Sequence, residues 1–488
     1  MLRALRPNVW LRWVYGLLGA GSILWIIYLY FGGTGVLALS YQFDSNSQAI
    51  SPFSPHGRAL DLERNQDNGE TYQRLVGEPA YFTARLPGSY DRLEVQLEYQ
   101  NPEQTVVELG VKQTSDKTLF DYLMKPLENK LVDDSSWSRL ESDQYVLLQR
   151  TPTYDSIDDF LTQPPINASI GSYFTVPSLP FTDPTYTPNN DKGSEITTTL
   201  RGKHEFYTYA AAGEVMTFSV EAATLNYIAG DDVVSVSLDY DGAELSTSGF
   251  TNRGVANLEA TAMVSGVYRL VIDCTDDVLI TNITSSQERL VVGKTLHLAG
   301  SEEYASSGIS INTAATTVSS DANWVTLIPK HSYAVGDYHF YDRVVTLGRI
   351  DTPITWVNPI GEREFELVVP NNDLYLESDS YFALPGAEAF DPWFGMRPIS
   401  QYTHADNLDY VFSGRYTEPT RLRGWTTASA SFDLTSVTQN KPNTLQFILS
   451  APGLSSASQG LKIRSIKVTA YQQPLSFNLL WEKLFGAN

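Results

Sequence analysis

The chain has almost no cysteine and is short of positive charge. Cys274 is the only cysteine among 488 residues, so no disulfide can form within one chain. A large exported protein without disulfides must depend on hydrophobic cores and hydrogen bonds, which is more typical of a bacterial or archaeal surface than of a eukaryotic one. Lys and Arg number 34 against 56 Asp and Glu, which gives a formal net charge of −22. Because nucleic acid recognition needs a basic surface, this balance predicts no nucleic acid partner.

The sequence also lacks the short motifs of common enzyme classes. It has no Gly-x-Ser-x-Gly elbow, no Walker loop and no dinucleotide fingerprint. His204-Glu205 begins like a zinc-protease motif, but Thr208 stands where the second histidine is required. His404, Asp406 and Asp409 could form a site, although Asx-rich loops also make turns. The absence of these motifs favours a protein without catalytic activity.

Two acidic segments resemble parts of calcium loops. They are Gly230-Asp231-Asp232 and Asp239-Tyr240-Asp241-Gly242. Calcium takes six or more oxygen ligands, and neither segment supplies that number. Asp-Gly is also a typical centre of a tight hairpin turn. We therefore predict no cofactor and leave a structural calcium ion as the alternative.

The longest run without charge lies in the N-terminal region. From Trp13 to Phe43 there is no charged residue, and three arginines precede this stretch. Residues 13–31 have about the length and apolar character needed for one transmembrane helix. The arginines keep residues 1–12 in the cytoplasm under the positive-inside rule, which places the rest outside the cytoplasmic membrane. The alternative is a cleaved signal peptide, because Val36-Leu37-Ala38 offers small residues for cleavage.

The remainder is dominated by alternating apolar and polar residues. Leu93, Val95, Leu97 and Tyr99 alternate with charged and amide side chains, as in a strand with one wet face. Helical patterns are few, with short candidates over 119–131 and 156–161. This predicts an all-β protein of tandem antiparallel β-sandwich or jelly-roll domains behind one N-terminal transmembrane helix.

Turn-rich stretches divide this part into three expected regions. A first domain covers 40–185, with the proline-rich segment 164–190 as an extended linker at its end, and a second covers 190–300. A third region, 301–475, could itself form two lobes. Residues 476–488 have the pattern of a short amphipathic helix.

One internal similarity suggests a duplication. Ser172-Tyr173-Phe174, with Asp183-Pro184 after it, is repeated at the same spacing by Ser380-Tyr381-Phe382 and Asp391-Pro392. A duplicated β-sandwich would produce this, and so would chance.

A resemblance to a known group of proteins covers residues 200–275. The run Leu200-Arg201-Gly202-Lys203-His204-Glu205-Phe206-Tyr207-Thr208-Tyr209, followed by Leu225-Asn226-Tyr227-Ile228-Ala229-Gly230-Asp231-Asp232, resembles uncharacterised membrane-anchored β-rich surface proteins of candidate-phyla bacteria. The resemblance implies a location and a fold. It implies no activity.

Aromatic residues are the main indication of a ligand. Trp393, Tyr402 and Trp425 are predicted ligand-binding residues, because sugar rings pack on aromatic faces. The alternative is that these rings fill an interface between two lobes. The sequence thus favours a single-pass, membrane-anchored cell-surface protein that binds or scaffolds a polysaccharide, a cell-wall polymer or an envelope protein. The alternatives are an envelope glycan-processing enzyme with paired carboxylates and an accessory subunit of a membrane assembly.

Overall fold

The chain is all-β and forms two compact units, residues 1–135 with 415–488, and residues 136–414. This computed structural model describes residues 14–22, 36–42, 49–66, 69–87, 90–113, 121–175, 179, 181–189, 192–225, 231–299, 315–340, 343–359, 364–369, 373–434, 437 and 444–471. The expected all-β class with several sheets is confirmed. The division differs from the expected consecutive domains 40–185, 190–300 and 301–475, because the chain leaves the first unit after Ser135 and returns to it at Arg415.

The expected membrane span lies mostly outside the described residues. Residues 14–22 are helical, and the rest of 13–31 is not described. Among the described residues, no helix is long and apolar enough to cross a membrane. The predicted tail 1–12 and the segment 476–488 also fall outside the described residues.

The first unit contains a jelly roll, called here jelly roll 1. One sheet contains β3 (Thr71–Leu75), β34 (Leu461–Tyr471), β5 (Arg92–Gln100) and β32 (Trp425–Asp433) in that order. The other contains β4 (Ala80–Arg85), β33 (Thr444–Ser450), β6 (Val106–Lys112) and β7 (Tyr122–Asn129). With the strands lettered B to I along the chain, these are the orders B-I-D-G and C-H-E-F of a jelly roll. The first sheet is extended by β2 (Ala59–Arg64), β31 (Thr420–Leu422) and β1 (Val36–Gln42).

The core of jelly roll 1 follows the alternation in the sequence. The four apolar residues of β5, Leu93, Val95, Leu97 and Tyr99, are fully buried, as expected. The expected helix over 119–131 is wrong, because most of it is strand β7, followed by the single turn α2 (Lys130–Asp133). The antiparallel pairing of β7 with β6 outweighs the local helical spacing.

The second unit contains two more jelly rolls. Jelly roll 2 pairs the sheet β12 (Leu200–Arg201), β19 (Val278–Ser285), β14 (Val215–Thr224), β17 (Arg253–Thr261) with the sheet β13 (His204–Ala210), β18 (Gly266–Asp273), β15 (Val233–Tyr240), β16 (Ala243–Thr251). Jelly roll 3 pairs β21 (Thr295–Leu298), β28 (Leu374–Ser378), β23 (Trp324–Pro329), β26 (Ile354–Val357) with β22 (Thr316–Ser320), β27 (Phe365–Val369), β24 (Gly336–Phe340), β25 (Arg343–Leu347). Both have the strand order of jelly roll 1.

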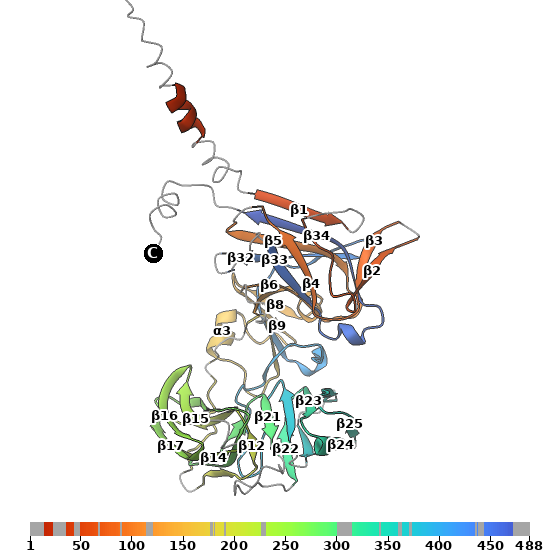
Figure 1. Ribbon diagram of the computed structural model, residues 1–488. Coiled ribbons are helices and arrows are strands. Elements are labelled where there is room, and N and C mark those ends of the chain that lie inside the picture. Colours follow the sequence, from red (N-terminus) through yellow and green to blue (C-terminus); the bar gives the residue numbers. More distant parts are fainter. Residues whose placement is uncertain are drawn as a thin grey trace, which may run out of the picture. The chain divides into compact units, whose positions relative to one another are not determined.

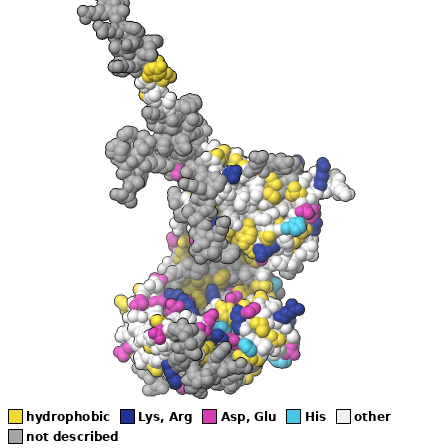
Figure 2. Space-filling model, in the orientation of Figure 1, with side chains coloured by type: hydrophobic (Ala, Val, Ile, Leu, Met, Phe, Trp, Pro, Cys, Tyr) yellow, Lys and Arg dark blue, Asp and Glu magenta, His cyan; other side chains and the backbone are white. Residues whose placement is uncertain are grey.

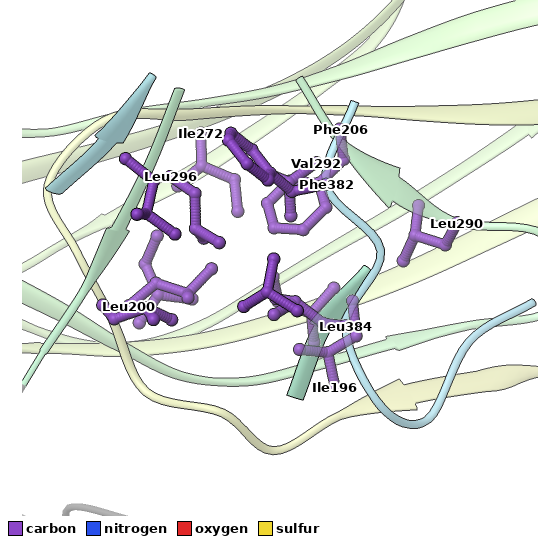
Figure 3. Close-up of a cluster of buried hydrophobic side chains, with 14 of the residues drawn as sticks. Ile196, Leu200, Phe206, Ile272, Leu290, Val292, Leu296, Phe382 and Leu384 are labelled. Atoms are coloured by element: carbon purple, nitrogen blue, oxygen red, sulfur yellow. The ribbon is translucent and has the colours of Figure 1, made fainter. Parts of the chain in front are cut away.

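Jelly rolls 2 and 3 share one sheet and one core. Strand β12 of jelly roll 2 pairs with β21 of jelly roll 3 through Leu200 and Leu298. This pairing joins the sheet that contains β12 to the sheet that contains β21, edge to edge. Side chains from both, with Phe382 and Leu384 after β28, meet in one hydrophobic cluster (Figure 3). Two short strands beside this joint are β11 (Ser194–Ile196), on β19, and β20 (Val291–Val292), on β13. The continuous core makes jelly rolls 2 and 3 one folding unit.

The second unit also contains a small mixed sheet, whose strands precede jelly roll 2 and follow jelly roll 3 in the sequence. Its order is β29 (Met396–Pro398), β10 (Ile170–Tyr173), β30 (Tyr410–Gly414), β9 (Tyr145–Gln149), β8 (Ser138–Glu141). Strand β10 is buried and lies inside the stretch expected as an extended linker, so that expectation is wrong for this part. The expected helix near 156–161 is confirmed as α3 (Ile157–Thr162), with Ser156 Oγ accepting from the Asp159 N–H at 3.1 Å.

Candidate functional site

The three predicted ligand-binding aromatics lie in different places. Trp393 and Tyr402 belong to the second unit and Trp425 to the first. Trp393 packs on Tyr207, with 5.2 Å between the two ring centroids. The Lys294 ammonium lies 4.9 Å from the centroid of the Trp393 ring. Tyr402 packs on Trp324 at 5.8 Å. Each ring thus already has a partner within its own unit.

Trp425 is the most enclosed of the three. It is 6% exposed at the start of β32, and the Arg464 guanidinium lies 4.5 Å from its ring centroid. A sugar needs an open aromatic face for stacking. Trp425 has the Arg464 guanidinium over its ring, and the residue lines a cavity.

This cavity in jelly roll 1 is the candidate functional site. Its volume is about 450 Å³, and its lining is Gln100, Asn101, Pro102, Glu128, Lys130, Asp134, Arg421, Gly424, Trp425, Thr426, Gln459 and Lys462. The residues come from the ends of β5 and β7, from α2, from the β31–β32 hairpin and from the start of β34. They meet because Leu422 pairs with Trp425 across a two-residue turn, with positive φ at Arg423 (51°) and Gly424 (79°). The turn brings Arg421 and Trp425 to the same rim.

A buried carboxylate anchors the cavity wall. Glu128 is 1% exposed and accepts hydrogen bonds from Asn101 Nδ2 at 2.7 Å, Arg421 Nη2 at 2.7 Å and the Tyr99 hydroxyl at 3.3 Å. The Arg421 guanidinium also pairs with Asp134. The hydrogen bond with Glu128 is the largest cause of the raised pKa of Arg421. Arg421 thus binds both acidic residues of the lining, and burying Glu128 requires such partners.

The remaining cations of the lining are hydrogen-bond donors. Lys130 Nζ donates to the carbonyl of Asn101 at 2.9 Å, and partial burial lowers the pKa of this ammonium. The Lys462 ammonium lies 5.4 Å from the centroid of the Tyr72 ring. With the amides of Gln100 and Gln459, these groups suit a polar ligand rich in acceptor oxygens.

A third acidic residue, Asp133, precedes the lining residue Asp134 in the chain. It accepts hydrogen bonds from the Asn129 N–H at 2.9 Å and from the Tyr416 hydroxyl at 2.7 Å. Burial raises the pKa of Asp133 to about 6, against these hydrogen bonds. Asp133 is outside the lining and supports the α2 turn that presents Lys130.

The second unit has a buried ionic cluster that the sequence did not reveal. Arg397 on β29 is buried and binds Asp321, between β22 and β23, at 2.7 Å and Asp391 at 2.9 Å. Although burial lowers the pKa of Arg397, the two carboxylates outweigh it and raise the pKa. Asp391 also accepts from the Trp393 N–H at 2.9 Å. The cluster joins jelly roll 3 to the small mixed sheet, which is a structural role.

A histidine cluster lies at the joint of jelly rolls 2 and 3. His204 is fully buried, and its Nε2 accepts from the His297 N–H at 3.0 Å, so its Nδ1 must donate to the Gly202 carbonyl at 2.9 Å. The His297 imidazole lies 2.9 Å from an Asp373 oxygen, and the Arg201 guanidinium lies 3.3 Å from the other. These hydrogen bonds connect β12, β13 and β21.

The calcium and acidic-loop candidates have other partners. Asp239 is paired with Arg269 at 3.0 Å, and Asp241 and Gly242 are the two positive-φ residues of the β15–β16 turn, as the hairpin alternative predicted. Asp409 accepts from the Ser169 N–H at 2.9 Å, which fits the turn interpretation. In the part of the chain that the structure describes, no group of three or more His, Cys, Asp or Glu is placed to hold a metal ion.

Comparisons with known proteins give no family. No family model matches the sequence, and no curated protein matches it. Among solved structures, the VP2 subviral particle of infectious bursal disease virus is 10% identical, with 90% of this chain and 76% of that chain covered and a TM-score of 0.11. A structure described as the triple jelly roll fold and turret assembly in an archaeal virus is 8% identical, with 72% and 96% covered and a TM-score of 0.11. At such TM-scores these similarities carry no inference about this chain.

Proposed function

We propose that the chain is a non-catalytic, single-pass membrane protein that serves as an extracytoplasmic scaffold at the cell surface. The observation that carries this proposal is the connection between the apolar segment and jelly roll 1. Only residues 32–35 separate the expected span 13–31 from β1, and β1 pairs with β34 over all seven of its residues. A span joined so closely to a paired strand would hold the whole jelly roll at the membrane.

Strand β1 is integrated into the domain rather than attached loosely. Leu37 and Leu39 pack against the core of jelly roll 1, and Tyr41 is 6% exposed within it. A force applied to residues 13–31 would therefore act on all seven paired residues of β1 and on their side-chain contacts at once. Such a junction suits a protein that must keep its folded domains in place at a surface.

The mixture of side chains on the surface of the second unit is compatible with a location outside the membrane. Figure 2 shows acidic, basic and apolar side chains interspersed over the surface of the second unit that faces the viewer, without one large field of one kind. A mixed, net acidic surface favours solubility outside the membrane. The partner of the scaffold is then an envelope protein or an envelope polymer.

The cavity of jelly roll 1 favours a second function, the binding of a polar ligand such as an acidic polysaccharide. Lys130 and Lys462 supply ammonium donors, and the amides of Gln100 and Gln459 supply further hydrogen bonds. The Trp425 ring adds an apolar contact. This function is compatible with the scaffold and would fix it to the polymer.

The anchor is tested by extraction of membranes with alkaline carbonate. The full chain should stay in the membrane pellet, and deletion of residues 13–31 should release it with an unchanged melting temperature. Replacing 13–31 by a leucine-alanine helix of equal length should restore retention. Protease outside the membrane should digest epitopes after residue 40 and spare a tag at Met1. Release of the full chain, or protection of the late epitopes in intact cells, would refute the proposal.

The ligand is tested separately with acidic polysaccharides such as polygalacturonate on an array. Lys130→Gln and Lys462→Gln should each lower retention by about tenfold, the effect of losing about 1.4 kcal/mol. Lys467→Gln is the matched control, because Lys467 is exposed on the same strand as Lys462 and is absent from the lining. If all three variants are retained as strongly as the wild type, acidic polysaccharides are excluded as ligands of this cavity.

A further inference from the structure

Strand β1 forms an open edge of jelly roll 1. Figure 1 shows β1 beside β34 in the first unit, and among the described strands β34 is its only partner. The other side of β1 therefore pairs with no described strand. An edge of this kind is a template on which a strand of another chain can add.

The sequence of β1 lacks the features that usually protect such an edge. Its seven residues include no charged residue, no proline and no glycine. The other two edge strands of the same sheet differ from it, because β2 contains three charged residues and β31 is three residues long with Arg421 at its centre. Charge and shortness both discourage pairing with another chain. This contrast indicates that β1 accepts a partner strand.

The side chains of β1 define what such a partner must bring. Leu37 and Leu39 pack against the core of jelly roll 1 but are only half-buried. Val36, Ala38 and Ser40 are exposed on the opposite face. A strand added at this edge would cover the two leucines and extend the core, provided that it carries apolar side chains on the same face.

Strand β1 of a second copy meets this requirement. Antiparallel pairing about Ala38 places Leu37 opposite Leu39 of the partner subunit and Val36 opposite Ser40 of the partner subunit. Residues of the same face are then paired, so the leucines of both copies lie on the core side. No like charges meet, because the strand has no charge. A two-fold axis through Ala38 lets the same surface serve both copies.

We propose that β1 is a dimerisation strand, which pairs antiparallel about Ala38 with β1 of a second copy of this chain. Main-chain hydrogen bonds between the two strands give the pair its affinity, and the leucines fix its register. This inference goes beyond the proposed function and does not depend on the membrane anchor. One sheet would run through both copies, and a dimeric scaffold would present each of its binding surfaces twice.

Cysteine cross-linking of the full-length chain tests the pairing. Cys274→Ser removes the only cysteine. In this background Ala38→Cys places two thiols on the two-fold axis, where opposite Cα atoms are about 4.5–5.5 Å apart and within reach of a disulfide. Copper phenanthroline, added to intact cells, takes up the two electrons, and the two thiol protons pass to water. We expect a covalent dimer of the full-length chain.

Val36→Cys is the matched control for this register. Val36 is exposed on the same face as Ala38 but lies about 14 Å along the strand from its own copy. Disulfides need Cα atoms within about 7 Å, so Val36→Cys alone should give about tenfold less dimer. Cells that make both Val36→Cys and Ser40→Cys chains should recover the dimer, because the register places these two residues opposite each other. This mixed pair also carries the test if Ala38→Cys fails to fold.

The oligomeric state of the purified full-length chain gives a second measurement without oxidant. Ala38→Lys would set two ammonium groups opposite each other and should raise the dissociation constant of the dimer about fivefold. The control is Ala243→Lys, at an exposed position of β16 in the second unit, which should leave the constant unchanged. A monomeric wild type would overturn the proposal, and so would equal cross-linking of Ala38→Cys and Val36→Cys. Cross-linking of Ala38→Cys to a different polypeptide alone would also overturn it, because the edge would then receive another protein.

Discussion

Acidification should loosen the joint between jelly rolls 2 and 3 through His204. This imidazole is fully buried, and burial lowers its pKa from 6.5 to about 4. Its Nε2 accepts the His297 N–H, so a proton added there would remove the acceptor and bury a charge. The folded pKa lies below the unfolded one. The unfolded chain therefore binds more protons between pH 6.5 and 4, and stability is lost as the pH falls through this window.

The magnitude follows from the difference between the two pKa values. The shift from 6.5 to about 4 corresponds to about 3 kcal/mol of unfolding free energy, at 1.36 kcal/mol per pKa unit. The loss begins near pH 6.5 and is complete below pH 4. Nearly all of it should be expressed in the second unit, which contains β12, β13 and β21.

Urea unfolding at several pH values, followed by amide hydrogen exchange of peptides from β13 and β21, measures this effect. His204→Gln removes the titration while its amide can still accept from His297, so its stability should fall less on acidification. The exposed His331→Gln variant is the control and should behave as the wild type. If wild type and His204→Gln lose the same stability between pH 6.5 and 4.5, the argument from buried His204 is refuted.

Three further predictions concern other buried groups. Arg397→Met leaves two carboxylates without their cation and should cost about 3–5 kcal/mol in urea unfolding; an unchanged midpoint would contradict the structural role. Trp425→Ala should lower the melting temperature, because truncating a buried tryptophan costs about 3–5 kcal/mol, and a normal melting curve would mean that the ring is not packed. Burial raises the pKa of Asp133 to about 6, so jelly roll 1 should lose stability as the pH rises from about 4 to 6. Asp133→Asn should abolish that trend, and a chemical-shift titration of the Asp133 carboxyl carbon with a midpoint near 4 would contradict it.

Local patterns in the sequence predicted strands and some turns correctly. The alternation over 93–99 gives the fully buried row of β5, and Asp241-Gly242 forms the expected tight turn. The helix α3 lies where a short helix was expected, and Ser156 caps it. These features depend on neighbouring residues only, which is why a single sequence shows them.

The division into domains could not be predicted in the same way. Strand β5 pairs with β32 and β34, more than 300 residues later, and no local signal marks that pairing. The apparent repeat at Ser172 and Ser380 also misleads. Ser172 lies in the mixed sheet and Ser380 follows β28 of jelly roll 3, so the repeated segments are not equivalent, although the jelly rolls themselves repeat.

The candidate site was predictable only through one residue. Trp425 was expected to bind a ligand and does line the cavity, although it is 6% exposed and the Arg464 guanidinium lies over its ring. Lys130 and Glu128 gave no sign in the sequence, because acidic and basic residues are common and their convergence depends on tertiary structure. Arg397 was hidden for the same reason.

The insertion of residues 136–414 into jelly roll 1 has a consequence for synthesis on the ribosome. Strands β3 to β7 emerge first, but their partners β32, β33 and β34 emerge only after the whole second unit. At about 5–20 residues per second, this delay is roughly 15–60 s. During that time the half-built sheets expose unpaired edges to other chains. The second unit can fold completely in this interval, so jelly roll 1, although its strands begin first, closes last.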